Sequence, residues 1–125
     1  MTLSHHVSNL ILSQRLKELG IEQKSLFRWT NEQLGGLRTN GYKWQVSFRP
    51  NPFPSDYESY SAFTASELGE MLPEGYVSVK ELDIWLCDKY ENLKTWAALR
   101  AEADTEADAR ALCLIHLLEN GLLKN

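Results

Sequence analysis

The sequence predicts an α+β fold: a small, mainly antiparallel sheet of about four strands packed with three helices, in the order α-β-β-α-β-β-α. Three observations carry this prediction. Residues 105–121 show a long apolar stripe at helical spacing, residues 42–48 alternate strictly between apolar and polar, and Thr64 and Glu67 have the spacing of a capping box at the start of a helix. One domain is expected over residues 1–125, because 125 residues suit a single core.

The composition is that of an ordinary soluble globule, with 43% hydrophobic and 24% charged residues. No apolar run approaches the ~20 residues that cross a bilayer, and the first ten residues lack the apolar region of a signal peptide. We therefore expect a cytoplasmic protein with no membrane partner. In a reducing compartment Cys87 and Cys113 are expected to be buried, free thiols.

The net charge of −4 is unevenly distributed. Residues 1–50 carry seven Lys or Arg and three Glu, whereas residues 51–125 carry six Lys or Arg and fourteen Asp or Glu. These halves either neutralise one another in the fold or attract partners of opposite charge. An acidic chain without clustered Lys and Arg does not indicate a nucleic-acid binder.

A first helix is predicted from Ser8, as its N-cap, to Leu19, with Gly20 as its stop. Its expected buried side is made of apolar residues at helical spacing: Ile11, Leu12, Leu16 and Leu19. The preceding pair His5 and His6 is expected to be a frayed end rather than a metal site, because adjacent histidines point in different directions and no third ligand is evident.

Residues 25–30 and 42–48 predict two antiparallel strands of a hairpin, joined by a glycine-rich loop. The period of two gives the hairpin one apolar face and one polar face. The polar face would carry the cations Arg28, Lys43 and Arg49.

Residues 50–63 are predicted to be a loop, because three prolines stand within five residues. The loop is rich in aromatic residues, which either fasten it to the fold or form a binding patch with the cations of the hairpin. The candidate ligand patch then consists of Arg28, Lys43, Arg49, Tyr57 and Tyr60. A short helix follows the capping box and ends at about Leu72, before Pro73.

Residues 76–100 allow two interpretations. A helix capped by Ser78 gives a tolerable apolar stripe, whereas residues 84–87 and 96–99 alternate as strands do. We favour strands, because a two-stranded hairpin is only marginally stable and needs further strands to carry a helix layer.

The last helix is predicted from its N-cap Thr105 to Gly121, with Asp108 completing a second capping box. Its apolar stripe is wider than one packing face needs, because Leu112 and Leu117 extend it. These two residues either pack against the first helix or, with His116, form the candidate interface with a partner protein or a second copy of the chain.

Four segments, residues 12–20, 25–29, 62–73 and 103–123, resemble a family of small uncharacterised proteins of phages and prophages. They cover about half of the chain, and the last is the most specific. The resemblance implies a phage origin in a bacterial host cell and an α+β sandwich in which a small sheet lies between helices. It implies no activity, since members of that family have no assigned function.

No catalytic constellation is evident, and the sequence predicts neither a cofactor nor a metal site. It contains no phosphate-binding glycine loop, no CxxC and no HExxH motif. Cys113 and His116 lie three residues apart, but the thiol falls in an apolar run without the electropositive setting that a nucleophile needs. The sequence therefore favours a non-enzymatic accessory protein that acts through a protein–protein interface, either as a monomer or as a homodimer. The alternative is a small ligand-binding or enzymatic domain with an anion pocket between the hairpin and the 50–63 loop.

Overall fold

The structure is a computed structural model that describes residues 3–30, 44–48, 59–90 and 101–123. Its helical elements are η1 (Leu3–His5), α1 (Leu10–Glu18), α2 (Ala65–Met71) and α4 (Glu106–Glu119). Its strands are β1 (Phe27–Thr30), β2 (Gln45–Phe48), β3 (Ser59–Ser61), β4 (Tyr76–Glu81), β5 (Ile84–Lys89) and β6 (Ala101–Ala103).

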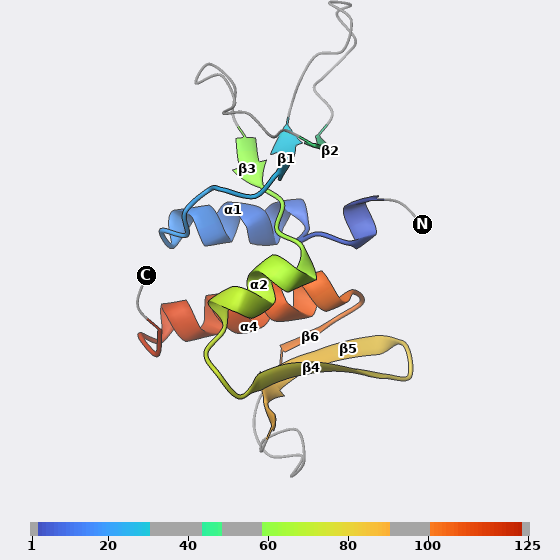
Figure 1. Cartoon of the computed structure of the whole chain (residues 1–125), viewed down its shortest axis with the longest axis vertical. Helices are drawn as coiled ribbons and strands as arrows, with labels where there is room; N and C mark the ends of the chain where they lie inside the picture. The colour runs from blue at the N-terminus through green and yellow to red at the C-terminus, as the bar shows by residue number, and fades with distance from the viewer. Residues whose placement is uncertain (1–2, 31–43, 49–58, 91–100, 124–125) are drawn as a thin grey trace, which may run out of the picture.

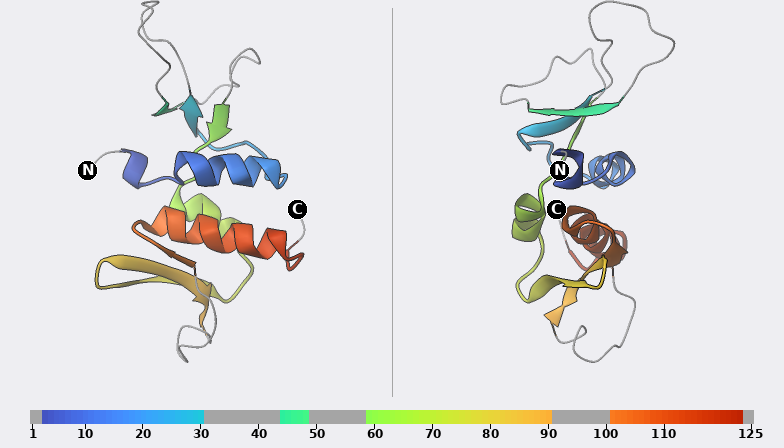
Figure 2. Two further views of the ribbon diagram at one scale, coloured as in Figure 1. Left: turned by 180° about the vertical axis from the view of Figure 1, so that it is seen from behind. Right: turned by 90° about the vertical axis from the view of Figure 1, so that its right-hand side faces the viewer.

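The helices form a central layer between two small sheets (Figure 1). The predicted α+β class with three helices is confirmed. The strands, however, form two separate three-stranded sheets rather than one sheet of about four. The resemblance to phage proteins implied a sheet between helices, and the structure has the opposite order of layers. Views from behind and from the side show one sheet on each side of the helices (Figure 2).

The first sheet has the strand order β2-β1-β3 and is antiparallel throughout. The predicted hairpin is confirmed in β1 and β2, where Trp29 pairs with Val46. The predicted loop at 50–63 is wrong at its end, because Ser59–Ser61 forms β3 beside β1. β3 was missed because three residues are too few to show a period of two. The predicted division into one apolar and one polar face also fails: Thr30 is fully buried, whereas Phe48 is more than half exposed.

The second sheet has the order β4-β5-β6. The strand interpretation of residues 84–87 is confirmed by β5, and the helical alternative for Ser78 and its neighbours is wrong because β4 occupies those positions. The predicted strand at 96–99 lies outside the described residues. Strands β4 and β5 are joined by a two-residue turn, since Glu81 pairs with Ile84.

Helix α1 begins one residue later than predicted. Asn9 is its N-cap and accepts a hydrogen bond from the backbone N–H of Leu12 at 2.8 Å. Ser8 is instead fully buried, where its hydroxyl contacts the hydroxyl of Ser13 at 2.8 Å and accepts from the backbone N–H of Phe63 at 3.1 Å. Of the predicted buried side, Leu16 is buried and Leu12 and Leu19 pack against the core, whereas Ile11 is 74% exposed.

Both other helices begin as predicted. Thr64 and Glu67 form a complete capping box on α2. Thr105 caps α4 by accepting from the backbone N–H of Asp108 at 3.2 Å. The second capping box is nevertheless wrong, because the side chain of Asp108 turns to Asn9 of the first helix.

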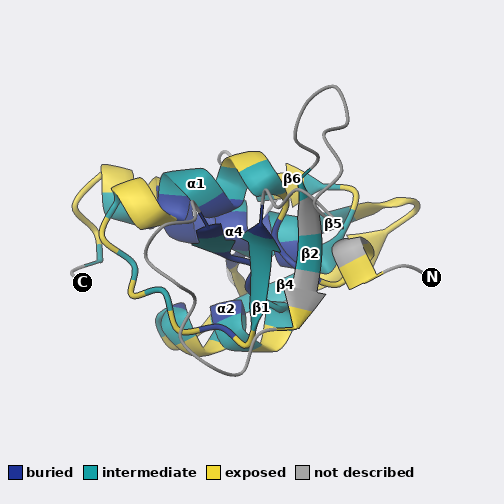
Figure 3. Cartoon of the chain, turned by 90° about the horizontal axis from the view of Figure 1, so that it is seen from above, coloured by how far each residue is buried: buried dark blue, intermediate teal, exposed yellow. Residues whose placement is uncertain are grey.

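Helix α4 lies at the centre of the molecule and contacts α1, α2 and all three strands of the second sheet. Viewed from above, its buried residues lie beneath α1 (Figure 3). The core joins them to Leu16 of α1, Phe63, Leu68 of α2 and Cys87 of β5. Near the C-terminal end of α4, Leu118 is only partly buried, whereas the small residues Ala109 and Cys113 are buried in the core.

Among the described residues, no helix combines the length and the hydropathy that a membrane crossing requires.

Candidate functional site

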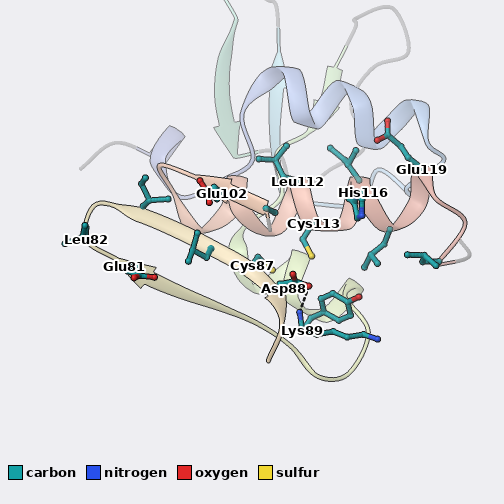
Figure 4. A pocket seen from close by; sticks show the side chains of 17 residues that line it. Glu81, Leu82, Cys87, Asp88, Lys89, Glu102, Leu112, Cys113, His116 and Glu119 are labelled. Carbon is teal, nitrogen blue, oxygen red and sulfur yellow. Dashed lines mark hydrogen bonds between the residues drawn. The ribbon is translucent and has the colours of Figure 1, made fainter. Parts of the chain in front are cut away.

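An open groove of about 1280 Å³ lies between α4 and the second sheet (Figure 4). Its walls are the C-terminal half of α4 on one side and strands β4, β5 and β6 on the other. Apolar side chains make up much of its lining: Leu82, Ile84, Leu86, Leu112, Ile115, Leu117 and Leu122.

All three residues of the predicted interface line this groove: Leu112, His116 and Leu117. Leu112 is partly buried and His116 is exposed, so both are accessible from the groove. Leu117 is only 3% exposed and belongs to the hydrophobic core, so its side chain offers little surface to a partner. The sheet β4-β5-β6, which the sequence did not predict as a whole, covers this side of α4.

The tip of the β4–β5 hairpin carries an exposed leucine in an uncommon backbone conformation. Leu82 is 92% exposed and has φ 56°, the left-handed region that favours glycine. Two-residue hairpin turns require a positive φ at their first position, and glycine or asparagine usually supplies it. Val79 and Ile84, just behind the tip, are 41% and 42% exposed. The tip is therefore an apolar projection on the solvent side of the groove.

Carboxylates surround this projection. Glu81 and Asp83 flank Leu82, and Glu102 and Asp104 follow on and after β6; all four residues are exposed. Lys80 and Lys89 are the exposed cations of the same sheet. The Lys89 ammonium lies 6.0 Å from the centre of the Tyr76 ring at the far end of the hairpin, which leaves the tip and its surroundings mainly negative.

Cys87 of β5 and Cys113 of α4 meet at the inner end of the groove. Both thiols are free and buried, as predicted from the sequence. A hydrogen bond between the two thiols lowers the pKa of Cys87 and raises that of Cys113. Burial also raises the pKa of the nearby Tyr76 hydroxyl.

A polar cluster fixes the hairpin to the helices. The Arg110 guanidinium donates to the hydroxyl of Ser78 on β4 at 3.0 Å and to the backbone carbonyl of Ala65 on α2 at 2.7 Å. It also pairs with Glu106 at 3.2 Å, and the Ser78 hydroxyl donates to the same carboxylate. One side chain of α4 thus connects the first strand of the groove wall with the start of α2.

Two residues of the predicted ligand patch, Arg28 and Tyr60, lie in the part of the chain that the structure describes. Tyr60 lies on β3, where its ring packs 5.6 Å from that of Trp44 and beneath the ammonium of Lys17. The Arg28 guanidinium donates to the backbone carbonyl of Gln23 at 3.0 Å. Both side chains therefore have structural contacts within the first sheet and its flanks. The remaining residues of the patch, Lys43, Arg49 and Tyr57, lie outside the described residues.

Sequence reasoning missed the hairpin tip. Residues 76–81 contain the alternation Tyr-Val-Ser-Val, but the turn has no glycine, asparagine or proline to mark it, and Leu82 looks like a core residue. In the part of the chain that the structure describes, no three His, Cys, Asp or Glu side chains are grouped so that they could hold a metal ion.

No family model, no curated protein and no solved structure matches this chain.

Proposed function

We propose that this chain is a non-enzymatic accessory protein that binds a partner protein through the β4–β5 hairpin tip and the adjoining groove beside α4. The observation that carries the proposal is Leu82, a leucine 92% exposed at φ 56°. A left-handed conformation costs a non-glycine residue roughly 1–2 kcal/mol, and an exposed leucine returns none of this by burial in the free protein. Contact with a partner would supply the missing burial.

The neighbours of Leu82 extend the same surface. Ile84 and Val79 are each exposed by about two fifths, and Leu122 beyond α4 is 66% exposed. Interfaces gain most of their affinity from a few large apolar side chains that insert into a pocket of the partner. We therefore expect Leu82 to be the anchor, with Ile84 and Val79 packed around it.

The charges around the tip define the kind of partner. Glu81, Asp83 and Glu102 are exposed carboxylates close to the apolar projection. A complementary partner has an apolar pocket bordered by Lys or Arg. A symmetric homodimer through this face would bring the same carboxylates together, which disfavours it, and the proposed partner is a different protein.

The resemblance of residues 103–123 and of three other segments to phage and prophage proteins supports a role in such an element. The proposed location is the cytoplasm of the bacterial host. Neighbouring genes of a phage cluster would support this part of the proposal, and neighbours of ordinary metabolism would contradict it.

Site-specific photo-crosslinking tests the interface. A photoreactive phenylalanine analogue at position 82 is expected to capture one protein in the host cell. The same analogue at position 11 is the matched control, because Ile11 is an exposed apolar residue of α1, 74% exposed. Capture of the same protein at both positions, or at neither, would contradict the proposal.

The captured protein is then purified and its affinity measured. Leu82→Asn is expected to weaken binding at least tenfold, because asparagine tolerates the left-handed conformation but removes the apolar anchor. Ile11→Asn should leave the affinity unchanged. Binding should also weaken with increasing ionic strength, since the charges at the rim are exposed. Sedimentation of the free protein distinguishes self-association, which would replace the proposed partner by a second copy.

A further inference from the structure

The two cysteines of this chain come from different elements and meet in the core. Cys87 is 1% exposed on β5, and Cys113 is 5% exposed on α4. In the close view, the sulfur of Cys113 points away from its helix toward the strand that carries Cys87 (Figure 4). Both residues also line the groove, so the pair lies at the boundary between the core and a solvent-accessible hollow.

The surroundings distinguish the two sulfurs. Interaction with the thiol of Cys113 favours the thiolate form of Cys87 and lowers its pKa, and the positive charge of Arg110 acts in the same direction. The negative charges of Asp88 and Glu106 oppose this effect. The pair therefore shares one proton more readily than two isolated thiols would, with the negative charge on Cys87.

We propose that Cys87 and Cys113 form an oxidation site at which a small peroxide produces an intrachain disulfide between β5 and α4. The common position of the two buried thiols beside the groove and the direction of the Cys113 sulfur toward the strand of Cys87 carry this proposal (Figure 4). Hydrogen peroxide suits the site because it is scarcely larger than water and can enter through the groove, where a bulky disulfide reagent is hindered by the burial of both sulfurs.

The chemistry balances without a further co-reactant. The thiolate of Cys87 attacks one peroxide oxygen, the O–O bond breaks, and the products are a sulfenic acid on Cys87 and hydroxide, which takes up the proton released from the thiol. The sulfur of Cys113 then attacks the sulfur of Cys87, the S–O bond breaks, and the proton of Cys113 leaves with the hydroxyl group as water. Two thiols and one peroxide give one disulfide and two waters, so the thiols lose the two electrons that the peroxide gains.

The bond would connect the strand and the helix that form opposite walls of the groove. It requires the two sulfurs to approach to about 2.05 Å, a shift that draws β5 and α4 together. Because the bond closes a loop from residue 87 to residue 113, it also restricts the unfolded chain. We expect the oxidised protein to melt about 10 °C higher than the reduced protein.

The test uses the full wild-type chain, folded and dilute, exposed to stoichiometric hydrogen peroxide. The expected product is a monomer about 2 Da lighter than the reduced protein, with no thiol available to iodoacetamide after unfolding, and with both properties reversed by dithiothreitol. Disulfide-linked dimers, stable addition of oxygen, or two alkylated thiols after treatment would each overturn the proposal. So would an oxidised monomer that melts below the reduced one.

The order of attack is tested separately. In Cys113→Ser no second thiol can displace the hydroxyl group, so the sulfenic acid should persist on Cys87 after peroxide treatment, and dimedone present while the protein is then unfolded should trap it. The matched variant Cys87→Ser leaves Cys113 with its higher pKa, and at least tenfold less adduct is expected. Equal trapping in both variants would overturn the assignment of Cys87 as the attacking sulfur.

Discussion

Asp108 of α4 accepts two hydrogen bonds from Asn9 at the start of α1, one from the backbone N–H at 2.7 Å and one from the side-chain amide at 3.3 Å. Asn9 in turn caps α1 by accepting from the backbone N–H of Leu12. The N-terminal turns of α1 and α4 are therefore connected through one carboxylate. Arg15 and Glu119 form a second connection further along the same helices, at 2.7 Å.

Two substitutions of Asp108 separate the contribution of its hydrogen bonds to the free energy of unfolding from the contribution of its charge. Asp108→Ala removes the acceptor for two donors of Asn9 and should lower the free energy of unfolding by about 1–3 kcal/mol. Asp108→Asn keeps one acceptor oxygen and should cost about 0.5–1 kcal/mol at neutral pH. Urea unfolding measures both, and equal losses in the two variants would contradict this interpretation.

The same carboxyl group should make stability depend on pH. Burial raises the pKa of Asp108, opposed by its hydrogen bonds from Asn9 and Thr105. The folded protein therefore binds a proton more readily than the unfolded chain, whose Asp titrates near about 3.9. The contribution of Asp108 relative to Asn is thus largest below about pH 4 and falls as the pH rises through the folded pKa. A difference between wild type and Asp108→Asn that grows with pH would contradict this.

Gly69 and Arg110 should be energetically coupled. A Cβ added at Gly69 of α2 would collide with the Arg110 guanidinium, which donates to the carbonyl of Ala65. Alanine is intrinsically the better helix residue by about 1 kcal/mol, but displacing the guanidinium loses hydrogen bonds to a charged group worth about 1.5–3 kcal/mol. Gly69→Ala should therefore lower the free energy of unfolding by about 1 kcal/mol.

A double-mutant cycle provides the control. In an Arg110→Ala background the collision is absent, and Gly69→Ala should instead stabilise the protein by about 0.5–1 kcal/mol. Denaturant unfolding of the four proteins gives the coupling energy. The same effect of Gly69→Ala in both backgrounds would show that the guanidinium is not the obstacle.

The two leucines of the predicted interface should respond differently to substitution. Leu117 is 3% exposed, so Leu117→Ala should lower the free energy of unfolding by about 2–5 kcal/mol. Leu112 is partly buried at the groove, and Leu112→Ala should cost less, about 1–2 kcal/mol, because part of its side chain is still exposed to water. Thermal unfolding with circular dichroism compares them, and equal losses would contradict the burial seen here.

Replacing Leu82 at the hairpin tip should raise the stability of the free protein while weakening the proposed binding. Leu82→Gly removes the strain of the left-handed conformation, about 1–2 kcal/mol, and adds an unfolded-state entropy cost of about 0.5–1 kcal/mol. The net expectation is a gain of about 0.5 kcal/mol in the free energy of unfolding, measured by urea titration. Because Leu82 buries almost nothing, a large loss of stability would show that the side chain has a packing role.

The sequence was sufficient for features that depend on local pattern. The capping residues Thr64 and Thr105, the alternation around Trp29 and the long stripe of α4 each carry their signal within about ten residues. Features that depend on distant partners could not be predicted. Ser8 looks like a helix cap in the sequence. In the fold its hydroxyl is instead buried, where it bonds to the hydroxyl of Ser13 and accepts from the backbone N–H of Phe63.

The candidate site was predictable only in part, for the same reason. Leu112, singled out for its apolar excess, lines the groove beside α4, but the burial of Leu117 could not be read from a sheet whose first strand has no turn signal. Short strands and a leucine in a turn give weak local patterns. Arg28 of the first hairpin illustrates the converse. Its guanidinium donates to the backbone carbonyl of Gln23, and the alternation of the strand alone cannot show this contact.

The central position of α4 has a consequence for how the chain is made. Residues 106–119 are synthesised after every other described element except the short stretch 120–123, and they pack against both the earliest helix and the latest strands. Until they leave the ribosome, Leu16, Phe63 and Leu68 lack the helix that buries them. The nascent chain should therefore depend on ribosome-associated chaperones through most of its synthesis, and folding should be completed only after translation has passed α4.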